Sequence, residues 1–416
     1  MSTLNSTQVN TARVARLLRG PMLFVFTLYA VELLDELIYG VESAALPLIR
    51  DDLALTYVQV GLLLTLPHLV GNVLDPVVGL LGDIWKRKAL IVVGALATAL
   101  AMVFVATGHT FAALAFAFCV SYPASTAYVS LSQATLMDLN PGRHDQTMAR
   151  WTVLGAIGQF AGPALVTGAL AVHFSWRGLY LGLALLAGLT GFIFWGQKFN
   201  GGHKAESEAP PHLLAGLREL PQLIRASGIL RWLVLLELAD LMLDVFFNFC
   251  ALYFTDVVGV SPALAGLAVT VLTLSGLVGD VLLIPLLEKV DGLRLIRLTA
   301  LVVLGVYTAF LLVPGVWPKF VLLAALGPLR SGWYQVLQGR AYSAMPGKSG
   351  TVIAITSLGG LAAASFPVIL GAVAERAGLG WAMALLTIAP VSLLIGLPRS
   401  NGYSAESRSS SSERDL

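Results

Sequence analysis

Charged side chains are scarce in this sequence. They make up 12% of the 416 residues, against about 25% in a typical soluble domain. Hydrophobic residues make up 57%, and the mean hydropathy is +0.80. This composition excludes an ordinary soluble domain. It predicts a protein that crosses the lipid bilayer several times.

Cysteine is almost absent too. Cys119 and Cys250 lie in separate apolar runs, which excludes a disulfide framework and a cysteine-based metal motif. No stretch interleaves basic and aromatic residues, so we expect no nucleic-acid partner. The sequence has no P-loop, no HExxH motif and no set of nucleophile, base and orienting residue. We therefore expect a protein that is not an enzyme, needs no cofactor and, if it transports actively, uses an ion gradient.

Long apolar runs are abundant, and each is long enough for a spanning helix, which needs roughly 20 residues. None alternates with the period of two that a membrane β-barrel requires. We predict an all-α membrane protein of twelve spans, at 22–48, 57–81, 89–107, 111–137, 151–172, 178–197, 231–255, 262–287, 294–313, 318–343, 350–373 and 379–397.

The spans fall into two groups of six around a polar stretch. We expect a cytoplasmic tail at 1–20, a first half at 21–197, a cytoplasmic linker at 198–230, a second half at 231–397 and a disordered cytoplasmic tail at 398–416. In the linker, Leu213, Leu217, Leu220 and Ile224 recur at helical spacing, which predicts an amphipathic helix on the membrane surface. A solvated connector is the alternative.

The basic residues predict the orientation. If both termini are cytoplasmic, the outside holds only Arg50, Arg177, Lys319 and Arg376. Arg330 and Arg340 lie within a span, and the rest of the 26 Lys and Arg residues lie inside. Positive residues concentrate on the cytoplasmic side of membrane proteins. We therefore expect cytoplasmic termini in the cell (inner) membrane.

The two halves repeat each other. LVGNVLDPVVGLLGD at Leu69–Asp83 aligns with LVGDVLLIPLLEKVD at Leu277–Asp291. Glu32 aligns with Glu237 in the same way, and Asp35 with Asp240. Parallel repeats of six spans are the architecture of major facilitator transporters.

The loop after the second span carries a second sign of that family. It reads GLLGDIWKRKAL, and its Gly79, Leu81, Asp83, Arg87 and Lys88 resemble the major facilitator superfamily signature, from which Ile84 and Lys86 depart. The resemblance implies a conformational gate in which Asp83 docks on the other half and helps to hold the outward-open state. A local pairing of Asp83 with Lys86 or Arg87 is the alternative.

A third motif lies on the fifth span. GQFAGPALVTG contains Gly158, Gly162 and Pro163, which resemble the antiporter motif of proton-coupled exporters. Val166 and Thr167 stand where that motif has paired glycines. The resemblance favours export. Plain helix packing through small residues explains the same pattern.

Several charges lie within the spans, where each costs about 2.5–3.5 kcal/mol at the bilayer centre. Glu32, Asp35, Glu36 and Tyr39 share one face of the first span. The in-membrane acids are Glu32, Asp35, Glu36, Asp75, Glu237, Asp240, Asp244 and Asp280, with Arg330 as the mid-membrane cation. So many acids cannot all be ionised at low dielectric, so we expect several to hold protons.

The resemblance implies that spans one, four, seven and ten line a central cavity. We take Glu32, Asp35 and Asp240 as the coupling or substrate carboxylates and Arg330 as their switchable partner. Span ten adds Trp333 and Gln338, whereas Glu42 is expected at the outer surface as a solvated residue.

These features predict a secondary active transporter that exports a small cationic or amphiphilic compound against protons by alternating access. One alternative is a divalent metal-ion exporter, with Asp35, His68, Asp75 and Asp240 as hard ligands. The other is a proton-coupled importer. From the resemblance we expect a monomer.

Overall fold

A computed structural model of the chain describes residues 21–84, 86–139, 144–197, 228–287, 289–344, 356 and 359–398. Their regular structure is helical and includes no strand, so the predicted all-α class is confirmed. A chain in lipid must satisfy its own backbone hydrogen bonds, which a helix does within each segment. The N-terminal half contains α2 (Pro21–Asp52), α3 (Tyr57–Ile84), α4 (Arg87–Thr107), α5 (Phe111–Leu139), α6 (His144–Ala171) and α7 (Trp176–Gly196).

The C-terminal half is more interrupted. Span seven joins four helical segments, spans ten and twelve are each made of two helices, and span eleven continues α16 back to residue 359. The elements are α9 (Ile229–Asp240), η1 (Leu241–Val245), α10 (Phe246–Tyr253), η2 (Phe254–Val258), α11 (Pro262–Leu287), α12 (Gly292–Leu312), α13 (Val316–Arg330), α14 (Trp333–Ser343), α16 (Phe366–Ala377), α17 (Leu379–Leu385) and α18 (Ile388–Gly396). The predicted tails and linker helix lie outside the described residues.

Within the described residues, nine helices are long and apolar enough to cross a membrane. The three remaining predicted spans are spans one, seven and ten, which carry most of the in-membrane charges or are interrupted. A charge that faces lipid is costly, so these three spans turn their polar faces toward protein. Span one contacts span seven through α2 and α10, and span seven contacts span ten through α9 and α14.

Glycines bring α2 and α6 into close contact. A Cβ on Gly158 would overlap the backbone oxygen of Leu33, and one on Gly162 would lie 2.6 Å from the carbonyl carbon of Gly40. A Cβ on Gly40 would in turn lie 2.9 Å from Cδ of Pro163. The antiporter-like motif therefore packs against span one. Small residues let membrane helices approach backbone to backbone.

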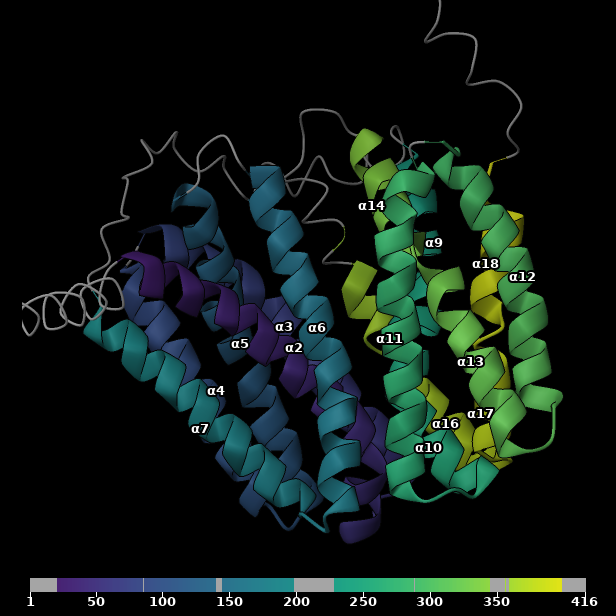
Figure 1. Ribbon diagram of the computed structural model, residues 1–416, viewed down its shortest axis with the longest axis horizontal. Helices are drawn as coiled ribbons and strands as arrows, with labels where there is room; N and C mark the ends of the chain where they lie inside the picture. The colour runs from purple at the N-terminus through teal and green to yellow at the C-terminus, as the bar shows by residue number, and fades with distance from the viewer. Residues whose placement is uncertain are drawn as a thin grey trace, which may run out of the picture.

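The two halves meet at one end of the bundle. We call the end where α2 begins and α18 ends the terminal end, and the opposite end the loop end. Helices α6 and α11, one from each half, converge toward the loop end at the bottom of Figure 1 and diverge toward the terminal end. The Ser43 hydroxyl donates to the backbone oxygen of Phe247 (2.9 Å), and the Val368 N–H donates to the Thr65 hydroxyl (3.2 Å).

A polar cluster ties the halves together at the loop end. Arg50 of α2 forms an ion pair with Asp256 of η2 at 2.9 Å. The Tyr57 hydroxyl donates to the same carboxylate at 2.7 Å, and the Tyr57 N–H donates to Glu375 of α16 at 2.8 Å. The Arg50 guanidinium also lies 4.3 Å from the centre of the Tyr57 ring. This end of the molecule is therefore closed.

Two irregularities distinguish the C-terminal half. In span seven, η1 and η2 are π-helical turns, whereas span one is a continuous α-helix. In span ten, α13 ends at Arg330, and Gly332 has a φ of +87° that only glycine adopts without strain. The break leaves Arg330 at a helix end midway along span ten.

Candidate functional site

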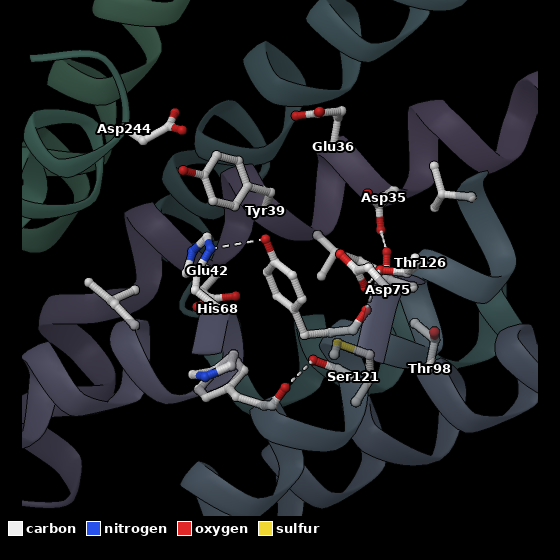
Figure 2. A pocket seen from close by; sticks show the side chains of 18 of the residues that line it. Asp35, Glu36, Tyr39, Glu42, His68, Asp75, Thr98, Ser121, Thr126 and Asp244 are labelled. Atoms are coloured by element: carbon white, nitrogen blue, oxygen red, sulfur yellow. Dashed lines mark hydrogen bonds between the residues drawn. The ribbon is translucent and has the colours of Figure 1, made fainter. Parts of the chain in front are cut away.

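A cavity of about 400 Å³ that is lined by several acidic and hydroxyl side chains opens within the N-terminal half, toward the C-terminal half (Figure 2). Its walls come from α2, α3, α4 and α5, and single residues are added by α6 and η1. The lining side chains that carry chemistry are Asp35, Glu36, Tyr39, Glu42, His68, Asp75, Ser121, Tyr122, Ser125, Thr126, Gln159 and Asp244. The cavity is large enough for a small organic molecule.

Helix α5 supplies hydroxyl groups to two of the carboxylates. Ser125 donates to Asp35 at 2.5 Å, and Thr126 donates to Asp75 at 2.7 Å. Asp35 lies on α2 and Asp75 on α3, so α5 fixes one acid from each neighbouring helix. Hydrogen bonds to charged groups contribute about 1.5–3 kcal/mol each, so these two acids are held in place rather than free to swing.

Aromatic side chains complete the walls. The Tyr122 hydroxyl lies 2.9 Å from Nδ1 of His68, and the two rings are 4.7 Å apart. The Tyr39 hydroxyl accepts a hydrogen bond from Asn248 of α10 at 3.2 Å. Tyr39 therefore joins the two halves at the cavity. Figure 2 shows Asp244 facing Tyr39 and Glu36 from the C-terminal half.

The charge of this cavity is one-sided. Five carboxylic side chains line it, and no Lys or Arg is among its described lining residues. At low dielectric, carboxylates this close to one another raise each other's energy when ionised. The arrangement favours cations, protons included.

A second cavity of about 180 Å³ lies in the C-terminal half, against α6. Asp280, Arg330, Ser331, Tyr334 and Gln335 contribute to its lining. Gln159 and Asp244 line both cavities. These two residues therefore mark where the cavities of the two halves meet.

The comparisons with known proteins agree with this architecture. A family model for the Major Facilitator Superfamily matches residues 28–364. The chain belongs to the major facilitator superfamily. It is a multi-pass membrane transporter of a small-molecule substrate, and not an enzyme.

Individual relatives are distant. The fosmidomycin resistance protein of Escherichia coli (strain K12) is 21% identical over 349 residues, which cover 83% of this chain and 84% of that protein. A bacterial homologue of the lysosomal transporter Spinster, inward-facing and unoccupied, has a TM-score of 0.70 at 13% identity, over 90% of this chain and 95% of that one. The nucleoside transporter NupG has a TM-score of 0.74 at 12% identity, over 90% and 98%. The structural likeness is one of fold.

The structure separates the predicted site residues of this transporter into two groups. Asp35, Glu36, Tyr39, Asp75 and Asp244 line the first cavity, and Asp244 and Arg330 line the second. Those that line neither cavity are Glu32, Glu237, Asp240, Trp333 and Gln338. The repeat in the sequence therefore does not translate into a symmetric site.

Both repeated glutamates lie in helix contacts. Glu32 Oε1 is 2.6 Å from where a Cβ on Gly155 would lie, and Glu237 Oε1 is 2.9 Å from the equivalent point on Gly359. Trp333 is fully buried and its indole N–H donates to Thr299 at 2.9 Å. These side chains are engaged with neighbouring helices and not with either cavity.

The remaining predicted residues are Asp240 and Gln338, which line neither cavity, and Arg330, which lines the second. Asp240 is within hydrogen-bond reach of Asp244. The buried Gln338 Oε1 has no hydrogen-bond partner among the described atoms. The Arg330 guanidinium donates to the backbone oxygens of Met242 and Leu243. In the described part of the chain no carboxylate lies within ion-pair distance of Arg330, which differs from the expected partnership with the acids.

The gate signature is only partly described. The side chain of Asp83 is outside what the structure describes, as are the surroundings of Gly79, so the proposed docking of Asp83 stays a prediction. Arg87 forms an ion pair with Asp138 of α5 at 2.5 Å. Lys88 donates to the backbone oxygens of Trp195 (2.9 Å) and Gln197 (2.5 Å) at the end of α7. These contacts of Arg87 and Lys88 stay within the N-terminal half.

The alternative metal ligands do not converge. Asp35, Asp75 and His68 engage Ser125, Thr126 and Tyr122, and Asp240 lines neither cavity. In the part of the chain that the structure describes, no three His, Cys, Asp or Glu side chains are placed to hold one metal ion. The geometry therefore offers no support for a metal-ion exporter.

Two features of the site were missed by sequence reasoning. Glu42 lines the cavity and is not a solvated surface residue. Glu42 follows Asp35 by seven residues and Tyr39 by three, which places it on the same helical face as both. This spacing is the sequence signal that indicates a place in the cavity. The loop-end cluster around Asp256 and Glu375 had no signal, because its members are far apart in sequence.

Proposed function

We propose that this protein is a proton-coupled exporter of small organic cations or cationic amphiphiles. The observation that carries the proposal is the one-sided charge of the main cavity. Asp35, Glu36, Glu42, Asp75 and Asp244 face a shared space with no basic residue in its described lining. A cation and protons would compete for the same carboxylates, so that binding one displaces the other.

Alternating access would convert this competition into transport. With the loop end closed by Arg50, Tyr57 and Asp256, substrate would enter from the terminal end. Protons would then be loaded after the halves rock about the cavity and open the loop end. Each proton that moves inward contributes about 2.3 kcal/mol per 100 mV, and a monovalent cation that leaves costs the same amount. In a one-for-one exchange the pH gradient therefore drives accumulation of the substrate outside, and the membrane potential adds to it only when a second proton enters.

The direction and orientation belong to the same proposal. Lys86, Arg87 and Lys88 lie at the terminal end, which supports a cytoplasmic terminal end in the cell (inner) membrane. Resistance, the property named for the Escherichia coli relative, favours export, because a transporter protects a cell by removing a compound. We propose that the protein works as a monomer, since each chain contains both halves and a whole cavity.

The test uses inside-out membrane vesicles that contain the protein. An acid interior should drive uptake of ethidium or tetraphenylphosphonium into them, because protons leave as the cation enters. Glu36→Gln and Asp35→Asn should each lower this uptake at least tenfold. Glu32→Gln is the matched control, since Glu32 is on the same helix but outside the cavity, and it should keep most of the uptake.

Two results would contradict the proposal. In one, no organic cation of a broad panel responds to the pH gradient. In the other, Glu32→Gln and Glu36→Gln lower uptake equally, which would deny the cavity its role. If the cation instead moves in the same direction as the protons, the protein is an importer.

A further inference from the structure

Span seven contains a π-helical turn at the junction of the two cavities. In η1 the Phe246 N–H bonds to the backbone oxygen of Leu241, five residues earlier. The flanking segments α9 and α10 are α-helical, with bonds that reach four residues back. Where the backbone hydrogen bonds change from a spacing of five residues back to a spacing of four, one carbonyl accepts no hydrogen bond from its own helix. Such a carbonyl in a membrane needs another donor.

Arg330 supplies that donor from span ten. Its Nη1 donates to the backbone oxygen of Met242 and, at 3.3 Å, to that of Leu243. Both carbonyls belong to η1. The guanidinium carbon also lies 5.6 Å from the centre of the Phe246 ring. Arg330 can reach across because α13 ends at this residue, just before the break at Gly332.

The turn decides where Asp244 points. One extra residue in a helix rotates everything after it by about 100°, so a π turn and an α turn present different residues to the cavity. Asp244 lies inside η1, is exposed and lines both cavities. If η1 tightened into an α-helix, Asp244 would be turned out of its present position.

We propose that Arg330 is a positioning residue that holds η1 in its π form through the carbonyls of Met242 and Leu243, and thereby places Asp244 at the junction of the cavities. Its Nη1 donates to backbone carbonyls, and no carboxylate of the described residues lies within ion-pair distance of it. The claim about position stands on geometry alone. The claim that Asp244 then handles substrate or protons rests on the proposed function.

The experiment reports the position of residue 244 without requiring transport. Cys119→Ser and Cys250→Ser remove the native thiols, and Asp244→Cys takes a nitroxide spin label. Collision with a water-soluble nickel chelate then measures exposure of the label to the cavity. Because the label replaces the carboxylate, any effect of Arg330 on it cannot pass through an ion pair with Asp244. A label at Glu36→Cys serves as reference on the opposite wall.

Arg330→Met should lower the accessibility of the label at 244 at least threefold and leave the label at 36 within its normal range. Arg340→Met is the matched control on the same span and should change neither label. Adding Asp280→Asn to Arg330→Met should not restore accessibility. Restored accessibility would show that Arg330 acts by pairing with Asp280, and would overturn the proposal. Unchanged accessibility of the label at 244 in Arg330→Met, or an equal change at both labels, would overturn it too.

A folding defect in Arg330→Met would not end the test. Deleting Leu243 removes the extra residue of η1 and with it the carbonyl that lacks a partner. The deletion should therefore make Arg330→Met recoverable as a monodisperse protein in gel filtration. Failure of the deletion to do so would count against the proposal. Absence of proton-driven transport in the unaltered protein, with the label at 244 behaving as expected in the labelled protein, would instead contradict the proposed function alone.

Discussion

Breaking the ion pair between Arg50 and Asp256 should open the loop end of the transporter. Nη1 of Arg50 lies 2.9 Å from Oδ2 of Asp256, and the side chain of Arg50 is 23% exposed and that of Asp256 17% exposed. An exposed ion pair contributes up to about 1 kcal/mol, and removing one partner of a buried pair costs about 3–5 kcal/mol. At this partial exposure we expect Arg50→Gln to weaken the closed loop end by about 2 kcal/mol, or roughly thirtyfold in population.

The assay measures the distance between the halves at this end. Spin labels at the exposed positions Thr56 and Ser261 lie on opposite halves, and double electron–electron resonance resolves the two populations. Asp256→Asn should give a shift in the same direction, because it also weakens the hydrogen bond from Tyr57. The double variant should shift by less than the sum of the two single shifts, since both remove one interaction.

Asp51 provides the control for this prediction. Its carboxylate lies 3.5 Å from Arg50, but it belongs to the same half and is 65% exposed. Asp51→Asn should leave the distance distribution unchanged. An equal shift in Asp51→Asn and Asp256→Asn would refute the reasoning, as would strictly additive shifts in the double variant.

Three further predictions concern stability, measured as the midpoint of thermal denaturation in detergent. Gly158→Ala should cost about 1–3 kcal/mol of stability through overpacking and lower the midpoint. Gly168→Ala is the control on the same helix, because a Cβ there would have nothing within 4 Å, and it should leave the midpoint unchanged. Equal midpoints for the two variants would contradict the close contact of α2 and α6. Gly332→Ala should cost about 1–2 kcal/mol because of its left-handed backbone, and an unchanged midpoint would argue against the break in span ten. Lys319→Met removes a buried donor to the carbonyls of α12. It should cost about 1–3 kcal/mol of stability and leave uptake per folded molecule unchanged. Lost uptake at an unchanged midpoint would show that Lys319 serves transport and not stability.

The spans could be predicted because lipid leaves a polar backbone few choices. The run at 57–81 became α3 (Tyr57–Ile84), and the run at 111–137 became α5 (Phe111–Leu139). The ends were missed by a few residues, because helices continue past the hydrocarbon into water. Hydropathy reports the hydrocarbon core and not the last hydrogen bond of a helix.

The interruptions could not be predicted to the same degree. The π turn η1 depends on a donor from another span, Arg330, and nothing in the residues of span seven announces it. The break at Gly332 left a weak signal in the stretch PLRSG, where a proline precedes a glycine inside an apolar run.

Within the site, residue type was easier to predict than direction. Charge inside apolar runs pointed to Asp35, Glu36, Asp75 and Asp244, and all four line the cavity. Glu32 shares a helical face with Asp35 and Glu36 but lies where α2 packs against α6, so its neighbour is a helix and not the cavity. Where two helices pack against each other depends on both helices, so the spacing of residues along α2 alone cannot predict it.

The central claim is that a cation and protons compete for the carboxylates of the main cavity. The most direct test adds a transported cation to purified protein in weakly buffered solution and follows proton release with a pH-sensitive dye. We predict that binding releases protons and that the double variant Asp35→Asn/Glu36→Gln releases few or none. Binding of the cation without proton release in the unaltered protein, or equal release from the double variant, would contradict the account.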